Sequence, residues 1–186
     1  MNKYNCLDIQ KFSLQNYVLI PIREEDIQSI RNWRNSQIDV LRQKKVISEK
    51  EQQEYYEKIL KKDFYKNNPE QILFSVLLKS QCIGYGGLVH IDWEQKSAEL
   101  SFLNETSRAN NFELYFKDFS KFLKIITQIA FDDIKFNQLV TETYNTRPKT
   151  IEILKKFGFK NKNTLKNHVE INGKLIDSLI LSLENK

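Results

Sequence analysis

The sequence predicts an α/β (α+β) fold, in which a mixed, mainly antiparallel central sheet of about six to seven strands is flanked by about four helices. Three observations support this prediction. Strand-like and helical patterns alternate along the chain, three strand-like segments follow one another in its middle, and a long helical segment connects them to a later strand. No repeat, low-complexity stretch or linker interrupts the pattern, so residues 1–186 are expected to form a single domain.

The first third of the chain predicts one strand and two helices. Apolar residues at 17–22 indicate the strand, and residues 24–35 indicate a helix with acidic residues at its start and basic residues towards its end. Ser48 followed by Glu51 is a capping-box pattern, which predicts a second helix continuing to about residue 62. The polar segment 63–70 is expected to be a loop.

The middle of the chain predicts an antiparallel meander followed by a long helix. Its three strands are expected at 72–78, 82–91 and 98–103. The three glycines of the second strand indicate a close approach, either of a ligand or of a packed helix. A polar loop is expected at 104–111. A broad apolar stripe then predicts a helix from about residue 114 to about residue 134.

The last third predicts a strand, a helix and a terminal hairpin. The strand is expected at 138–144, and the helix at 147–157 with Gly158 as its C-terminal cap. Asn172-Gly173 is the strongest hairpin-turn signal in the sequence. The strands of this hairpin are expected at 164–171 and 175–183.

Composition and charge narrow the class of protein. Of the 186 residues 40% are hydrophobic and 28% charged, and the net charge is +5. This excess is modest and spread along the chain, so we expect no nucleic-acid partner, although a phosphate-bearing ligand would suit it. Two cysteines indicate a reducing compartment, and two histidines without a cysteine cluster predict no metal site. No signal peptide or membrane span is apparent, so a cytoplasmic location without membrane contact is expected.

Four local sequences in this order carry a family resemblance: VLIPIREEDIQSIRNWRN, CIGYGGLVHID, AELSFLNE and IEILKKFGF. Together they resemble the GNAT superfamily of acyl-CoA N-acyltransferases, over about residues 17–183. The opening segment resembles the branch that contains ribosomal-protein and amino-sugar acetyltransferases. Trp33-Arg34-Asn35 and the following ISEKEQQEYYEKI look most like enzymes that acetylate nucleotide-linked amino sugars.

The resemblance implies an activity and its partners. It implies transfer of an acetyl group from acetyl-CoA, a co-substrate, to a primary amine by direct attack, without a metal. The expected acceptor is a small amine, an amino sugar linked to a nucleotide, and the expected assembly is a monomer or homodimer. The alternatives are acetylation of a protein N-terminus, as in ribosomal-protein acetyltransferases, and a degenerate, non-catalytic or carrier-protein-dependent member of the family.

The resemblance also places the donor. The family carries Gln/Arg-x-x-Gly-x-Gly/Ala after the fourth strand, where backbone N–H groups cradle the CoA pyrophosphate. The matching residues here are Arg108, Ala109, Asn110, Asn111 and Phe112, followed by Glu113. Asn111 replaces a glycine and is the residue type that best tolerates φ > 0. Glu113 would repel a pyrophosphate unless it turns outward; otherwise a carrier protein with fewer phosphates is the donor. The resemblance further implies that Phe102, Leu103, Asn104 and Asn145 hold the pantetheine arm.

Three residues are candidates for acid–base chemistry. Glu99 matches the strand position where related enzymes hold a general base, although a strand glutamate facing solvent is an equal alternative. His90 is a second candidate base and acceptor contact, although a hydrogen-bonded histidine at a strand end is an alternative. Leu154 stands where many members have a thiolate-protonating tyrosine, so Tyr144 is the expected substitute. His168 is expected at the surface.

The acceptor side is expected around the first helix. Trp33 and Arg34 are candidate substrate-binding residues, because arginine pairs well with phosphate. The alternative is a buried tryptophan and a surface arginine. For Arg42, in the loop that follows, a plain surface position is expected.

Overall fold

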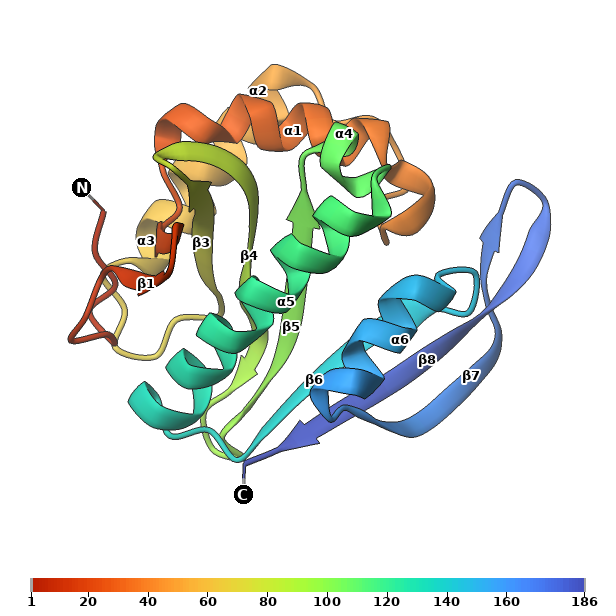
Figure 1. The fold of residues 1–186 in the computed structure, drawn as a ribbon. Helices are drawn as coiled ribbons and strands as arrows, with labels where there is room; N and C mark the ends of the chain where they lie inside the picture. Colours follow the sequence, from red (N-terminus) through yellow and green to blue (C-terminus); the bar gives the residue numbers. More distant parts are fainter. Residues whose placement is uncertain (1, 186) are drawn as a thin grey trace.

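The computed structural model describes residues 2–185, which form one eight-stranded sheet with the strand order β1-β2-β3-β4-β5-β6-β8-β7 (Figure 1). The mixed, mainly antiparallel sheet is as predicted, but it has one strand more than the expected upper limit. The additional strand is β1 (Phe12–Leu14), which forms a tight hairpin with β2 (Tyr17–Pro21). Gln15 in this turn has φ 56°, a conformation for which glutamine gives no sequence signal.

The predicted meander is confirmed. Its strands β3 (Ile72–Leu78), β4 (Gln81–Asp92) and β5 (Ser97–Asn104) pair antiparallel in sequence order. A Cβ atom on Gly86 would lie 2.4 Å from the Ser101 carbonyl oxygen and 2.9 Å from a ring carbon of Phe122. The glycine at this position therefore leaves room for the helix that carries Phe122 to pack closely on the strand. This contact favours helix packing over the close approach of a ligand as the reason for the glycine.

The two helices predicted in the first third are present, and the second ends at Asp63, close to the predicted residue 62, but is not one regular α-helix. The first is α1 (Ile27–Ser36), preceded by a 3₁₀ turn over Glu24–Asp26. The second begins as α2 (Glu49–Tyr55), changes to a π-helical turn and ends as α3 (Lys61–Asp63). The capping box is present, because the Ser48 hydroxyl accepts from Glu51 N–H while Glu51 accepts from Ser48 N–H.

The long crossover helix is confirmed, but the loop expected before it was wrong in part. Residues Thr106–Ala109 form a short helix, α4, ahead of α5 (Phe112–Gln128) and its terminal π-helical turn. The cause is a tertiary contact: Arg108 of α4 forms an ion pair with Asp118 of α5. The apolar stripe of α5 packs on the sheet, with Phe122 fully buried.

The last third follows its sequence signals closely. Strand β6 (Gln138–Tyr144) and helix α6 (Pro148–Phe157) end where predicted, and Gly158 caps the helix with φ 111°. The terminal hairpin joins β7 (Lys160–Ile171) to β8 (Lys174–Glu184). Its turn residues Asn172 and Gly173 both have positive φ, 52° and 73°, as a two-residue hairpin turn requires.

One strand pair sets the position of the site. Strands β5 and β6 are the only parallel neighbours in the described sheet, and they pair only from Ser97↔Gln138 to Glu99↔Val140. Beyond these residues the two strands diverge. Helices α5 and α6 lie on one face of the sheet, while α1 and α2 lie towards the other (Figure 1). The divergence therefore opens a slot in the sheet with different helices on its two sides.

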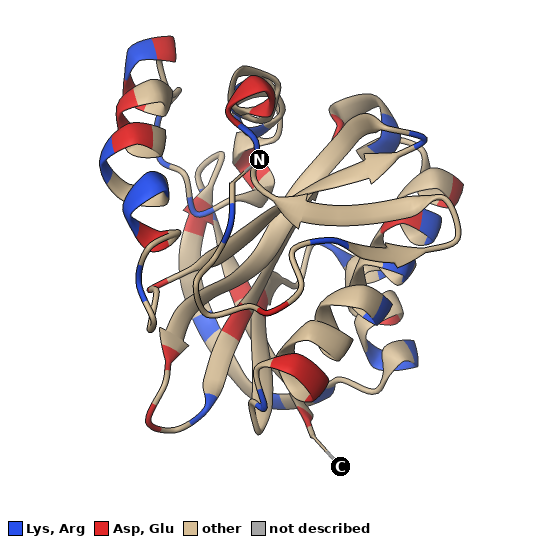
Figure 2. Ribbon diagram, turned by 90° about the vertical axis from the view of Figure 1, so that its left-hand side faces the viewer, with Lys and Arg blue, Asp and Glu red and all other residues tan. Residues whose placement is uncertain are grey.

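On the ribbon of Figure 2, the Lys and Arg positions are interspersed with Asp and Glu positions along the chain. No helix within residues 2–185 is long and apolar enough to cross a membrane. In the same residues, no group of three or more His, Cys, Asp or Glu side chains is arranged to hold a metal ion.

Candidate active site

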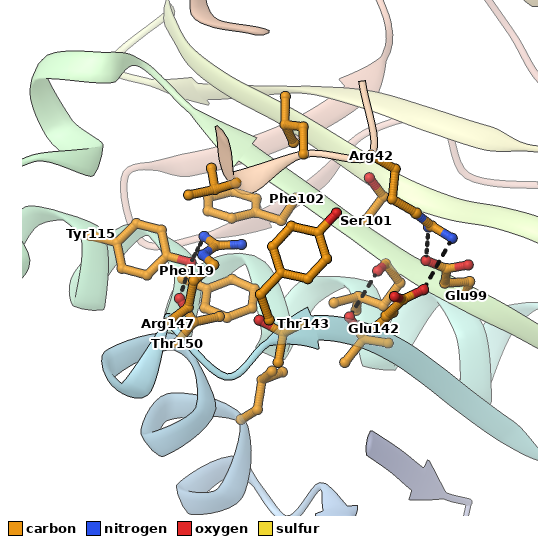
Figure 3. A pocket seen from close by; sticks show the side chains of 16 residues that line it. Arg42, Glu99, Ser101, Phe102, Tyr115, Phe119, Glu142, Thr143, Arg147 and Thr150 are labelled. Atoms are coloured by element: carbon orange, nitrogen blue, oxygen red, sulfur yellow. Dashed lines mark hydrogen bonds and ion pairs between the residues drawn. The ribbon is translucent and has the colours of Figure 1, made fainter. Parts of the chain in front are cut away.

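The slot between β5 and β6 contains a cavity of about 100 Å³ (Figure 3). Phe102 lines one side and stacks on Phe119 of α5, with ring centroids 5.0 Å apart. Thr143 of β6 and Leu154 of α6 line the other side. The slot is narrow, and its lining mixes apolar side chains with polar and charged ones, among them Arg42, Glu99 and Thr143.

Thr143 is the notable polar group in this wall. Its hydroxyl oxygen is buried and has no hydrogen-bond partner in the described chain. Thr141, two residues earlier on the same strand face, donates its hydroxyl to the Leu100 carbonyl oxygen at 3.2 Å. Leaving a buried hydroxyl unpaired costs free energy of folding. The Thr143 hydroxyl is therefore available for a hydrogen bond to a polar group that enters the slot.

The α5–α6 side of the slot holds a second polar cluster (Figure 3). The Tyr115 hydroxyl lies 3.1 Å from the Thr150 hydroxyl and accepts from Arg147 Nη2 at 3.3 Å. Leu154, one turn after Thr150, is buried and apolar. No proton donor therefore stands at the α6 position where the family resemblance implies a tyrosine.

On the face of the sheet away from α5 and α6, two carboxylates face each other where β5 and β6 diverge. Glu99 of β5 and Glu142 of β6 are 15% and 12% exposed, and Arg42 bridges them (Figure 3). Arg42 Nη1 lies 3.5 Å from Glu142 Oε2, and Nη2 contacts Glu99 Oε1. The second oxygen of Glu142, Oε1, is buried without a hydrogen-bond partner in the described residues.

Both histidines approach this acidic pair. His90 Nε2 lies 3.8 Å from Glu99 Oε2, and His168 Nε2 lies 3.6 Å from Glu142 Oε1. His90 is largely exposed and has φ 48°, an unusual conformation at the bulge of β4. His168 and Arg42 are both exposed, as expected, but each side chain also reaches the acidic pair, His168 from the terminal hairpin and Arg42 from the loop after α1.

A larger groove of about 510 Å³ lies where α5 and α6 begin. The predicted donor residues Ala109, Asn110 and Phe112 line it, together with Arg147 and Lys149 of the α6 start. Lys149 Nζ lies 4.5 Å from the Phe112 ring centroid. Two cations beside the first turn of a long helix make this groove suitable for phosphate groups.

Two residues of the segment predicted to bind the pyrophosphate are engaged in contacts within the protein. Arg108 makes two hydrogen bonds, of 2.7 and 2.8 Å, to the fully buried carboxylate of Asp118, so its Nε and Nη2 are already engaged. Asn111 has φ −102°, so it adopts no glycine-like conformation. Its side chain instead caps α5 by accepting from Leu114 N–H at 3.1 Å.

Of the residues predicted to contact the pantetheine arm, some line the slot and others do not. Phe102 lines the slot, whereas Leu103 is buried elsewhere and Asn104 donates to Asp118 at 3.2 Å. Asn145 lies outside the slot, and its backbone N–H donates to the Asp177 carbonyl oxygen.

Tyr144 lies at the end of β6 and lines the slot beside Glu142. Burial, and next the nearby Glu142 carboxylate, raise the pKa of the Tyr144 hydroxyl. The side chain therefore stays protonated at neutral pH and can donate a proton.

A second cavity, of about 420 Å³, lies between the sheet and the α1–α2 helices. Arg34 lines it, donating from Nη1 to the Tyr85 hydroxyl and from Nε to Gln43 at 3.0 Å. Trp33, the other predicted acceptor residue, is half-buried and packs against the core, which is the alternative reading for a tryptophan.

Sequence reasoning missed Glu142, Thr143, Tyr115 and Lys149. Only Glu142 left a usable signal, because it shares a strand face with the predicted Tyr144, two residues away.

Comparison with known families decides the class. The profile of the GNAT acetyltransferase domain matches residues 19–180, which is most of the chain. The chain belongs to the GNAT acetyltransferase family. The predicted fold class is therefore confirmed, as is the predicted enzyme class, an N-acetyltransferase with acetyl-CoA as co-substrate. Comparison with curated proteins finds no match.

Solved structures share the GNAT fold over nearly the whole length. Spermidine N-acetyltransferase from Vibrio cholerae, in complex with CoA and spermine, has a TM-score of 0.78 and 18% sequence identity, covering 92% of this chain and 97% of that chain. A dodecameric structure of spermidine N-acetyltransferase from the same organism has a TM-score of 0.75 at 18% identity, covering 92% and 95%. At this identity the likeness establishes the fold and leaves the acceptor open.

Proposed function

We propose that this GNAT enzyme acetylates a primary amine that binds, as an ammonium ion, between Glu99 and Glu142. The observation that carries this proposal is the buried Oε1 of Glu142, which accepts no hydrogen bond in the described residues and has only His168 Nε2 near it, at 3.6 Å, beside a second carboxylate at the edge of the slot. A carboxylate oxygen taken out of water without a donor is costly. An ammonium carries three N–H donors and can satisfy it.

In the free protein, the guanidinium of Arg42 occupies this ammonium site. Its side chain is 51% exposed and comes from an irregular loop, so moving it costs few buried contacts. An acceptor ammonium that replaces the guanidinium keeps both carboxylates paired. We therefore propose that Arg42 leaves the two carboxylates when the acceptor enters.

The chemistry then follows from the residues on this side of the slot. Glu99 removes a proton from the ammonium, directly or through water, with His90 as the alternative base. The amine attacks the thioester carbonyl carbon, and the carbon–sulfur bond breaks. Tyr144 donates a proton to the departing thiolate and regains one from the nitrogen that forms the amide, and Glu99 releases its proton to water, so a neutral amide, free CoA and one proton result.

The donor is proposed to lie on the α5–α6 side. The pantetheine arm passes between Phe102 and Thr143, and the Thr143 hydroxyl bonds one of its amides. The pyrophosphate lies in the groove at Ala109 to Phe112, with Arg147 and Lys149 as counter-charges. Glu113 points to solvent, so its carboxylate leaves the phosphates free.

Three acceptor classes enter the test. The sequence suggests nucleotide-linked amino sugars, with protein N-termini as the alternative, and the solved structures of similar fold include an enzyme bound to spermine, a polyamine. An acidic pair suits the amine of each class. The distinguishing features lie beyond the ammonium site.

The decisive experiment follows thiol release from acetyl-CoA with one panel containing all three classes. Glu142→Gln keeps the shape and removes the charge, and should raise the KM for the amine roughly tenfold to a hundredfold while the KM for acetyl-CoA stays unchanged. Glu94→Gln, in the exposed turn before β5, is the matched control and should behave like the wild type. Unchanged amine KM in Glu142→Gln would overturn the ammonium site.

The degenerate and carrier-protein alternatives are tested by calorimetry with CoA. Binding of CoA, with thiol release for at least one amine, supports the proposed enzyme. If CoA does not bind at millimolar concentration, the acetyl-CoA donor site is wrong, and an acyl carrier protein becomes the donor to test.

A further inference from the structure

We infer that the cavity between the α1–α2 helices and the sheet binds the body of the acceptor, and that this acceptor is a compact amine with an apolar body and one acidic group at its far end. The inference rests on the proposed function, because it takes the position of the ammonium from Glu99 and Glu142. It adds the chemistry of the rest of the acceptor.

The cavity continues from the ammonium site. Ser101 of β5 lines both the slot and this cavity, and Val89, which also lines it, is the register partner of Glu99 on β4. Glu99 and Ser101 are two residues apart on one strand and therefore share a face of the sheet. An amine held at Glu99 can extend its body along this face, beneath α1 and α2, without crossing the sheet.

The walls of the cavity select an apolar body. Its volume of about 420 Å³ is within the range of small-molecule sites, about 300–1,000 Å³. Ile30 of α1, Leu73 of β3 and Leu60 form buried parts of the lining. Leu60 belongs to the π-helical turn that follows α2, and such turns occur often at functional sites. A body without charges fits these walls at the lowest desolvation cost.

Two polar side chains in the cavity point to an acidic end group. Arg34 uses Nε and Nη1 for hydrogen bonds, but its Nη2 donates to nothing in the described chain. Gln52 of α2 is only 5% exposed and also lines the cavity, so its side-chain amide is a second polar group that faces a ligand there. A guanidinium N–H and an amide together suit one carboxylate or phosphate oxygen pair.

The charges near the cavity also disfavour other amines. Glu51 lies at the wall, but it is engaged by Lys45 and by the Ser48 backbone, so Arg34 provides the unneutralised charge. A polyamine would place its second ammonium near this guanidinium. A nucleotide diphosphate would bring two phosphates against one guanidinium and apolar walls. Both conflict with the cavity more than a single acidic group does.

The test compares three amine series of matched chain length: ω-aminocarboxylates, plain alkylamines and α,ω-diamines, with ω-aminoalkyl phosphates as a second acidic arm. We expect the acidic series to have the highest kcat/KM and the diamines the lowest. Arg34→Gln should remove the preference for the acidic series, a loss of roughly tenfold to a hundredfold. Arg34→Glu should reverse it in favour of the diamines.

Arg31→Gln is the matched control, because Arg31 lies on the same helix but lines neither cavity and pairs with Glu49. It should retain the wild-type order. Equal kcat/KM for the three series, or a preference that Arg34→Gln leaves intact, overturns the inference while leaving the acetyltransferase proposal standing. Selective use of polyamines or of nucleotide-linked sugars overturns it as well.

Binding without turnover supplies an independent readout. With CoA at saturation, thermal shifts are measured for the same series on the wild type and on Arg34→Gln. A shift with the acidic amines that is lost in Arg34→Gln supports the cavity's specificity even if no amine is acetylated, in which case only the proposed reaction fails. No shift for any series, or an equal shift for all, counts against the cavity.

Discussion

Replacing Thr143 with valine should raise the stability of the free protein and lower its affinity for CoA. The two effects have one cause. The Thr143 hydroxyl is buried in the slot and unpaired in the free chain, and it is proposed to bond a pantetheine amide when the donor enters. Valine has nearly the same shape and no hydroxyl, so it removes an unsatisfied polar atom in one state and a hydrogen bond in the other.

The magnitudes follow from the burial of the group. Leaving a buried polar atom unpaired costs about 1–3 kcal/mol, so we expect a gain of about 1 kcal/mol in the free energy of unfolding, and about 2–4 °C in melting temperature for a chain of this size. Losing one net hydrogen bond of about 0.5–1.5 kcal/mol weakens CoA binding roughly 2- to 12-fold.

The assay is urea unfolding for stability and calorimetry for CoA affinity, with Thr141→Val as the matched control. Thr141 lies on the same strand face, but its hydroxyl is already bonded to the Leu100 carbonyl oxygen. Its replacement should lower stability by about 1 kcal/mol and leave CoA affinity unchanged. If Thr143→Val loses stability and keeps wild-type CoA affinity, Thr143 has a structural partner and the proposed donor path is wrong.

Four further outcomes are expected. Tyr144→Phe should lower kcat with little change in either KM, and because burial raises the pKa of Tyr144, the wild-type rate should show no alkaline loss below about pH 10; an equal kcat in Tyr144→Phe would exclude the proton donor. Partial burial raises the pKa of Cys6 to about 11 and of Cys82 to about 12, so both thiols should react slowly with a disulfide reagent in the native protein, and labelling at pH 8 as fast as in the unfolded chain would contradict the raised pKa values. Burial likewise raises the pKa of Tyr17 to about 12, above the unfolded value of about 10. The stabilising contribution of Tyr17 is therefore complete below pH 10 and is lost between about pH 10 and 12. Denaturant titrations at a series of pH values will detect this loss, and a free energy of unfolding that does not fall over this range would refute it. Asp118→Ala should cost about 3–5 kcal/mol in urea unfolding, because it leaves Arg108 without its buried partner, and a near-neutral result would show that the ion pair is dispensable.

The elements that could be predicted are those whose signals are local. The capping box at Ser48, the Gly158 cap and the Asn172-Gly173 turn each depend on residues a few positions apart, and each is found in the structure. The meander followed by a crossover helix could also be predicted from the sequence, because the period of the hydrophobic residues changes from two to 3.6 along the chain. Strand β1 was missed because its turn contains a glutamine with positive φ.

The site was less predictable because it is assembled from distant segments. Arg42 reaches Glu99 and Glu142 from a loop with no regular pattern, across 57 positions in the case of Glu99. The family resemblance predicts the donor site at Ala109 and Asn110, which line a groove in the structure, but it could not show that Arg108 is engaged by Asp118. That ion pair spans two helices, and one of them was predicted as a loop.

The most direct test of the account is a crystal structure of the protein with CoA bound. The account predicts electron density for the pantetheine arm between Phe102 of β5 and Thr143 of β6, with the pyrophosphate beside Arg147 and Lys149. It would be contradicted by a slot that stays filled by its own side chains while CoA binds elsewhere on the molecule.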